Sequence, residues 1–383
     1  MNKLQRLLLL GIALPMLAIV LFWQPRFDRD WVDAEDTREF HKELMQVLVN
    51  VFDRSSGLFH YSVSTRGKLS DRNNAIRQLL GSRVLAENSH DKESLLELHR
   101  QNLQTLMTRW YRVEGDIGYV LFKNKSKLGA NAMLLRVILA SPDYQQFGEQ
   151  ARQLVNGILS LMEENGAFRP WLIEPDYEYD ANYLLTFYSG EALLALFEYV
   201  EKSGNQTVLA QAIHSQDYYL NRYVRQMALH YYPAYVPWHT QSLYKAWQLT
   251  DDEKYANAIL VLNNKVLELQ DQEHHRGRFY NPETPQYGKP HSSSDAVYVE
   301  GLAVARKLAV DIADDDHQVR YNQAIRIGLE YLQYNQLRNQ APINIEGRDL
   351  RINLNGGIVT KRDGHWVRID TTAHALDALA QLQ

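Results

Sequence analysis

The 383-residue chain contains no cysteine, which excludes disulfides, thiolate catalysis and cysteine-based metal sites. It also lacks the Gly-x-Gly-x-x-Gly, P-loop, Gly-x-Ser-x-Gly and His-Glu-x-x-His motifs, so nucleotide binding, serine-hydrolase chemistry and that zinc chemistry are disfavoured. The adjacent pair His274 and His275 does not have the spacing of two ligands of one metal ion. There is no Lys/Arg run, and the formal net charge is -5. We therefore expect no metal, no cofactor and no nucleic-acid partner.

Only one long apolar run is present, from Leu7 to Trp23, and it follows Lys3 and Arg6. The run is near the lower length limit for crossing a bilayer. It ends without the small residues of a signal-peptide cleavage site. We expect residues 1–30 to form an uncleaved single-pass anchor and linker, with a cleaved signal as the alternative. The short basic N-terminus favours the inside, which places a globular domain of residues 31–383 outside the cytoplasmic membrane, in a bacterial periplasm.

Beyond the linker, apolar residues recur at helical spacing. The pattern predicts twelve helices, at about 36–52, 74–87, 91–113, 128–140, 144–165, 187–202, 207–227, 238–249, 252–270, 294–312, 316–337 and 370–382. Short connections alternate with long ones that carry glycine and aromatic residues. One rim of the molecule should therefore have tight turns and the other elaborate loops, where functional residues concentrate.

Alternate helices open with a polar residue at the same phase, followed by a small or polar residue and an apolar stretch. These six residues are Arg77, Asn131, Glu191, Gln241, Glu300 and His374. A repeat of roughly 50 to 70 residues, each a helix pair, is typical of helical arrays. The first and last helices lack a partner and can pair with each other. The sequence thus predicts an all-α (α/α)6 toroid with the six polar side chains around one cavity; an open solenoid is the alternative.

Several of these residues are candidates for proton transfer. Glu191 and Glu300 are suited to a pair of general acid and base at a glycosidic bond. Asp180 lies in an acidic aromatic loop, and His374 and His239 can exchange protons near neutral pH. The structural alternative is that the carboxylates cap helices or form ion pairs with Arg77, and that Asp180 is a solvated loop acid.

Aromatic residues are abundant, with 23 Tyr and 7 Trp, and many lie in the predicted loops. Such residues stack on sugars, although they also pack at the edges of cores. The candidate substrate-binding residues are Tyr188, Trp238, Tyr232 and Tyr235, together with Arg77, Asn131, His239 and Gln241. The sequence shows no obvious arginine cluster for binding a uronate.

Two segments resemble inner-helix openings in the (α/α)6-toroid superfamily of glycan-active proteins: Tyr188-Ser-Gly-Glu-Ala-Leu-Leu-Ala-Leu and Trp238-His-Thr-Gln-Ser-Leu-Tyr. That superfamily includes glycoside hydrolases, polysaccharide lyases, sugar 2-epimerases and the helical domain of D-glucuronyl C5-epimerases. The resemblance covers nearly all of the region after the linker. It implies a carbohydrate-active enzyme, and it makes Tyr298 a further catalytic candidate because proton abstraction from a uronate is commonly assigned to Tyr or His there. The motifs of terpene and lanthionine cyclases are absent.

From these observations we expect a membrane-anchored enzyme that hydrolyses an envelope or extracellular polysaccharide. Hydrolysis is ranked first because two glutamates belong to the predicted ring and no arginine cluster is evident. A uronate lyase or C5-epimerase-like enzyme is one alternative. The other is a non-catalytic toroid that binds a glycan or peptide in an envelope assembly or secretion complex.

Overall fold

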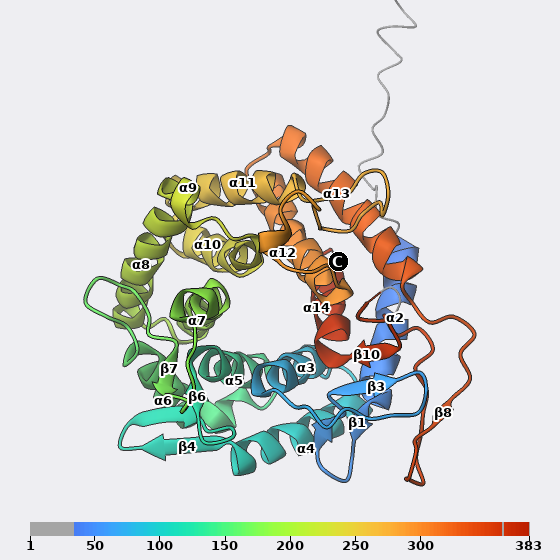
Figure 1. The fold of residues 1–383 in the computed structure, drawn as a ribbon. Coiled ribbons are helices and arrows are strands. Elements are labelled where there is room, and N and C mark those ends of the chain that lie inside the picture. Colours follow the sequence, from blue (N-terminus) through green and yellow to red (C-terminus); the bar gives the residue numbers. More distant parts are fainter. Residues whose placement is uncertain (1–33, 362–363, 383) are drawn as a thin grey trace, which may run out of the picture.

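The computed structural model describes residues 34–361 and 364–382, which form two concentric rings of helices (Figure 1). The inner ring consists of α3 (Ala75–Glu87), α5 (Leu128–Ala140), α7 (Ala181–Ser203), α10 (Val236–Thr250), α12 (Ser292–Asp311) and α14 (Ile369–Ala380). The outer ring consists of α2 (Ala34–Asn50), α4 (Glu93–Arg109), α6 (Gly148–Leu159), α8 (Gln206–Leu220), α11 (Glu253–Leu267) and α13 (Asp315–Tyr334). The predicted (α/α)6 toroid is therefore confirmed for the described residues.

The ring closes between the two ends of the described chain. Helix α14 packs against both α2 and α3. Leu44 and Leu48 of α2 and Leu376 and Leu379 of α14 are all buried in the same core. Strand β3 (Ser62–Ser64) pairs with β10 (Trp366–Arg368) in antiparallel register beside this contact. The expected pairing of the first and last helices is thus present, and the open solenoid is excluded.

Small residues allow the inner helices to approach one another closely. A Cβ atom added to Gly190 of α7 would lie 2.6 Å from the Cβ of Trp238 on α10, and one added to Gly301 of α12 would lie 2.8 Å from the Cα of Pro237. No side chain fits at these distances, so glycine is required for the spacing of the helices. The same crowding brings the starts of the inner helices close to one axis.

The helix boundaries differ from the prediction where local polar contacts or turns compete. Helix α7 begins at Ala181, earlier than expected, because the Asp180 carboxylate accepts a hydrogen bond from the Tyr183 backbone N–H and caps the first turn. The helix predicted over 91–113 ends at Arg109. The chain then forms a hairpin of β4 (Tyr111–Glu114) and β5 (Ile117–Val120), and Gly115 supplies the positive φ of its turn.

The long connections run from outer to inner helices and hold the short strands and helical turns. Besides β3, β4, β5 and β10, these are β1 (Phe52–Asp53), β2 (Leu58–Phe59), β6 (Ser126–Lys127), β7 (Trp171–Ile173), β8 (Ile343–Asn344), β9 (Arg351–Ile352), η2 (Asn221–Arg225), α9 (Met227–His230), η3 (Pro233–Tyr235) and η4 (Pro285–Tyr287). The turn η1 (Tyr144–Phe147) lies in a short inner-to-outer connection instead. This arrangement gives the toroid one elaborate rim, as predicted.

Within the described ranges, 34–361 and 364–382, no helix has the length and apolar character needed to cross a bilayer. The predicted anchor, Leu7 to Trp23, lies outside these ranges.

Candidate functional site

A cavity of about 500 Å³ opens at the elaborate rim, and all six inner helices contribute to its wall. This volume is in the range of small-molecule sites. The residues of the inner helices on its wall include Arg77, Met133, Tyr188, Glu191, Trp238, Ser293, Tyr298, Asp370 and His374. The connections between helices add Tyr232, Tyr287, Lys289, His291 and, from β10, Arg368. The cavity therefore combines aromatic surfaces with titratable groups at the starts of the inner helices.

Glu191 is a buried carboxyl group whose hydrogen-bonding capacity is incompletely satisfied. Its side chain is buried, and Oε2 has no hydrogen-bond partner among the described residues. Burial raises its pKa to about 7, with smaller opposing effects from Arg136 and His374. Gly129 of α5 leaves the space that this oxygen occupies, since a Cβ there would overlap it. Glu191, which lines the cavity, can therefore carry a proton at neutral pH.

His374 reaches the same cavity and is oriented from behind by a carboxylate. Its Nδ1 lies 2.8 Å from Oε2 of Glu300, whose Oε1 accepts a hydrogen bond of 2.8 Å from Gln241 Nε2. Burial lowers the pKa of His374, but the hydrogen bond and charge of Glu300 outweigh it and raise the pKa above its usual value. Because Nδ1 is held by Glu300, Nε2 is the ring nitrogen left for proton exchange in the cavity.

Glu300 and His374 also approach Asp377, and their ligand atoms lie within 4.8 Å of one another. These residue types can ligate a metal. However, Arg83 donates a hydrogen bond of 3.0 Å to Asp377 Oδ2, so a protein cation already neutralises this carboxylate. Burial raises the pKa of Asp377 above its usual value, with Arg83 opposing the shift. The cluster is a buried network of charged and hydrogen-bonding groups that includes His374 of the cavity wall.

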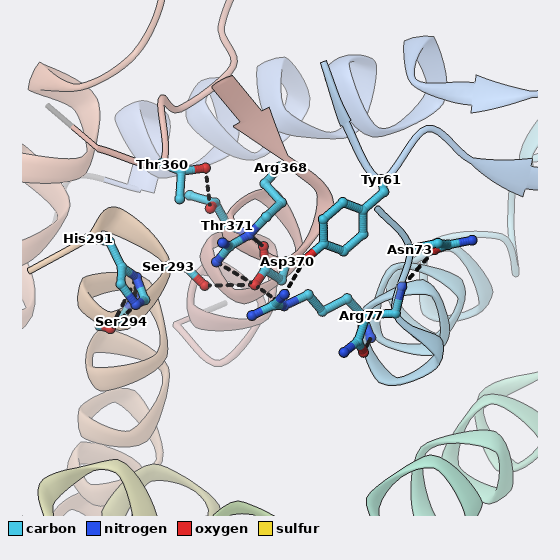
Figure 2. Close-up of polar contacts among 11 residues, drawn as sticks. Tyr61, Asn73, Arg77, His291, Ser293, Ser294, Thr360, Arg368, Asp370 and Thr371 are labelled. Carbon is cyan, nitrogen blue, oxygen red and sulfur yellow. Dashed lines mark hydrogen bonds and ion pairs between the residues drawn. The ribbon is translucent and has the colours of Figure 1, made fainter. Parts of the chain in front are cut away.

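Asp370 is the centre of a second polar cluster on the cavity wall (Figure 2). Arg77 Nε lies 2.7 Å from its Oδ2, and Arg368 binds it through two nitrogens. Ser293 Oγ and the Thr371 backbone N–H donate to it at 3.1 and 3.0 Å. Burial alone would raise the pKa of Asp370, but the two arginines lower it to about 2. The group is ionised, and its oxygens are already occupied by donors.

Aromatic rings form much of the remaining wall. The Trp238 ring lies edge-on to the His374 ring, with centroids 5.7 Å apart. Burial raises the pKa values of Tyr188 and Tyr298 far above their usual values, so neither hydroxyl ionises at neutral pH. Both predicted residues line the cavity. Their electrostatics suit stacking and hydrogen bonding rather than proton abstraction.

Three members of the predicted ring do not line the cavity, and that expectation is corrected. Asn131 is buried and accepts hydrogen bonds from the Val120 backbone N–H and Ser126 Oγ, so it holds a loop in place. Gln241 and Glu300 lie behind His374. A residue at one helical phase points inward or into a helix interface according to the rotation of each helix, and the repeat alone does not determine that rotation.

Three other predicted residues also lie away from the cavity lining. His239 is fully enclosed, with Nε2 2.9 Å from Ser189 Oγ. Tyr235 is buried and donates to the Tyr223 carbonyl. Asp180 is exposed and caps α7. In contrast, Arg77, Tyr188, Glu191, Tyr232, Trp238, Tyr298 and His374 all line the one cavity.

The prediction missed Asp370, Arg368 and His291. Asp370 stands four residues before His374 on the same helix, and that spacing places both on one face. This signal was available in the sequence. Arg77 and Arg368 come from opposite ends of the chain, so the arginine cluster that the sequence seemed to lack is created only by ring closure. His291 caps α12 through a hydrogen bond from Ser294 N, and burial lowers its pKa to about 4.

No protein-family model matches the chain, and no curated protein matches it in sequence. Solved structures with the same architecture are (α/α)6 toroids of glycan-active enzymes. D-mannose isomerase matches with a TM-score of 0.68 at 12% identity, over 94% of this chain and 99% of that one. Cellobiose 2-epimerase from Bacillus thermoamylovorans matches with a TM-score of 0.66 at 11% identity, over 91% and 100%.

An inactive variant of the GH76 alpha-1,6-mannanase of Salegentibacter sp., in complex with alpha-1,6-mannotriose, matches with a TM-score of 0.65 at 14% identity, over 90% and 98%. These three proteins are named for isomerisation, epimerisation and hydrolysis. At such low identity the likeness establishes the fold of this chain and does not choose among the reactions.

Proposed function

We propose that the protein is a carbohydrate-active enzyme that transfers protons to and from a sugar bound in the central cavity, with Glu191 as the general acid. The observation that carries this proposal is the Glu191 carboxyl: buried, lacking a partner at Oε2, and with a pKa raised to about 7. A group with a pKa near the working pH is the most effective proton donor or acceptor. The aromatic wall supplies the surfaces on which a sugar would stack.

His374 is the second catalytic group in this proposal. Glu300 holds it in one orientation, which is the arrangement of a base with its orienting carboxylate. In an isomerase, epimerase or lyase, His374 Nε2 would take a proton from a carbon next to a carbonyl or carboxyl group. The electron pair left behind would move toward that group. Glu191 would donate its proton to the oxygen that gains charge, or to the leaving oxygen in an elimination.

Hydrolysis, with its demand for two carboxyl groups, is the second candidate. It is supported by the divergent pKa values of Glu191 and Asp370, about 7 and about 2, in one cavity. Against it, the oxygens of Asp370 already accept from two arginines, a serine and a backbone N–H. A base or nucleophile needs a free lone pair. We therefore rank proton transfer at carbon ahead of hydrolysis.

One NMR experiment in D₂O tests the proposal and separates the reactions. Neutral and uronic oligosaccharides are incubated with the full-length protein. Deuterium entering a C–H position marks proton abstraction, vinyl signals mark elimination, and new reducing ends without deuterium mark hydrolysis. Glu191→Gln should lower turnover by about 10²-fold or more. The control Asp180→Asn keeps an N-cap and should retain full activity.

An active Glu191→Gln variant would remove the proposed role of that residue. Binding of a glycan without any turnover by the wild type would favour the non-catalytic toroid in an envelope complex.

We also propose that residues 1–30 anchor the enzyme in the cytoplasmic membrane, with the toroid on the outer side and acting on an envelope or extracellular polysaccharide. The support is the apolar run Leu7 to Trp23 after Lys3 and Arg6. Cell fractionation should leave the full chain in the inner membrane and release a chain that lacks residues 1–30. A mature form starting after Trp23 would instead indicate a cleaved signal.

A further inference from the structure

A second, smaller cleft of about 220 Å³ lies on the elaborate rim and is strongly cationic. Three lysines line it: Lys123, Lys125 and Lys127. Tyr177, Asn73 and Asn74 complete its wall together with apolar residues, and the lining contains no carboxylate. Neither Glu191 nor His374, the two groups of the proposed proton transfers, lines this cleft.

The backbone places these lysines together by a specific turn. Phe122 and Lys125 form an antiparallel bridge, and the two residues between them, Lys123 and Asn124, have φ values of +52° and +59°. This is the left-handed turn in which Asn or Gly is preferred, so a lysine at the first position is unfavourable by itself. Lys125 and Lys127 then alternate with the buried Ser126 along an extended segment and point to one side.

The three lysines have no close carboxylate partner in the described part of the chain; burial and Lys125 lower the pKa of Lys127, and the charge of Glu191 only partly opposes them. Among the described residues, none of the three forms an ion pair with a carboxylate, whereas Lys245 and Lys254 elsewhere do. Their ammonium groups lie against aromatic rings instead, Lys125 at 4.5 Å from the Tyr177 ring centroid and Lys127 at 5.1 Å from that of Trp171. The acidic residues of the Tyr177 loop, Glu174, Asp176 and Glu178, are exposed and do not line the cleft.

The cleft adjoins the central cavity. Asn74, the N-cap of α3, lines both. The Lys127 ammonium lies 5.9 Å from the ring centroid of Tyr188, which stands on the cavity wall beside Glu191. One extended ligand can therefore reach both places. A local excess of positive charge on a protein with a net charge of -5 attracts anions specifically to this side of the rim.

We propose that the cleft formed by Lys123, Lys125 and Lys127 is a subsite for an anionic group on the sugar next to the one in the central cavity. The substrate is then an anionic oligosaccharide or polysaccharide, bearing carboxylate or sulfate groups. Ammonium groups recognise such anions as point charges, without the planar geometry that arginine demands. This inference rests on the proposed function, because it extends the same site.

The experiment measures binding of matched oligosaccharides to the full-length protein by calorimetry at low and at moderate salt. The probes are a neutral oligomer, an oligouronate and a sulfated oligomer of equal length. The Lys123→Gln/Lys125→Gln double variant should weaken binding of the preferred anionic oligomer about tenfold or more and leave the neutral one unchanged. Added salt should weaken anion binding by the wild type more than by the variant. The preferred oligomer identifies carboxylate or sulfate as the ligand.

The matched control is Lys202→Gln/Lys307→Gln, which removes two other lysines that lie over tyrosine rings, those of Tyr144 and Tyr244. It should bind every oligomer like the wild type. Equal affinity of the test variant for the anionic oligomer, or equal weakening for neutral and anionic ones, would overturn the inference, as would preference of the wild type for the neutral oligomer. Lysine-dependent binding without turnover would refute the proposed function and leave the subsite standing. Turnover of neutral oligomers at the same rate by the wild type and the lysine variant would support the proposed function and refute the anionic subsite.

Discussion

Two buried histidines of the inner ring, His239 of α10 and His374 of α14, have opposite electrostatics. His239 lies among tyrosines, with the Tyr223 and Tyr219 ring centroids 5.1 and 5.4 Å away and Ser189 as its polar partner. Burial lowers its pKa to about 3. His374 is also largely buried, although it lines the cavity, and Glu300 raises its pKa above the usual value.

The comparison shows that the neighbouring groups, rather than burial, determine which histidine is suited to proton transfer. A histidine sealed among apolar and hydroxyl groups stays neutral at every physiological pH and contributes packing and one hydrogen bond. A histidine backed by a carboxylate and open to a cavity can gain and lose its proton. In sequence the two are alike, because each follows the start of an inner helix.

The largest expected effect comes from substituting His374, and the same substitution at His239 is the comparison. His374→Asn should lower the turnover number by about 10²–10⁴-fold, because the amide cannot exchange a proton. His239→Asn should cost about 1–3 kcal/mol of stability through a poorly satisfied buried amide, and the folded fraction should keep its activity. Kinetics and thermal unfolding of both variants provide the measurement. Similar activity losses in two fully folded variants would erase the distinction between the histidines.

The fold was predictable because its evidence is local. Apolar periodicity recurs over whole helices, and the predicted helix 128–140 coincides with α5. Errors occurred at ends such as Asp180, where one capping hydrogen bond extends α7 beyond the apolar pattern. Closure was also predictable, since a helix without a partner at each end leaves apolar surface to bury.

The site was only partly predictable because it depends on rotation and on distant contacts. Glu191 and Glu300 occupy equivalent positions in the repeat, yet one lines the cavity and the other lies behind His374. A small rotation of a helix about its axis separates these outcomes. The pairing of Arg77 with Asp370 joins the two ends of the chain, and no local spacing signals it.

Two carboxyl groups, Glu191 of α7 and Asp295 of α12, also have similar surroundings and different positions relative to the cavity. Both are buried, each has one oxygen without a partner, and burial raises each pKa to about 7. The folded state therefore keeps a proton that the unfolded state loses at lower pH. Each group contributes its full share to the free energy of unfolding below its unfolded pKa, about 4.5 for Glu191 and 3.8 for Asp295. That contribution is lost as the pH rises to about 7.

Glu191→Gln and Asp295→Asn should each flatten this fall between about pH 4 and pH 7, by at most ~3 kcal/mol for Glu191 and ~4 kcal/mol for Asp295. Chemical unfolding at a series of pH values measures it. Only Glu191 lines the cavity, so only Glu191→Gln should also lower turnover, by about 10²-fold. Loss of turnover in a stable Asp295→Asn variant would mean that cavity exposure does not separate the two carboxyls.

The smallest expected effect concerns the space that Glu191 needs, tested with two helical glycines. A Cβ at Gly148, the first residue of α6, would have no atom within 4 Å, so Gly148→Ala should stabilise the protein by about 0.5–1 kcal/mol and leave turnover unchanged. A Cβ at Gly129 would overlap Glu191 Oε2 and lie 2.6 Å from the Tyr188 ring. Gly129→Ala should therefore not stabilise the protein as Gly148→Ala does. Because it displaces the Glu191 carboxyl, it should also lower turnover by about tenfold, which corresponds to ~1.4 kcal/mol in the activation free energy. Thermal unfolding and kinetics of the two variants compare both effects directly. If Gly129→Ala turned over substrate at the wild-type rate, the Glu191 carboxyl would have room to move, and catalysis would not depend on its position beside Gly129.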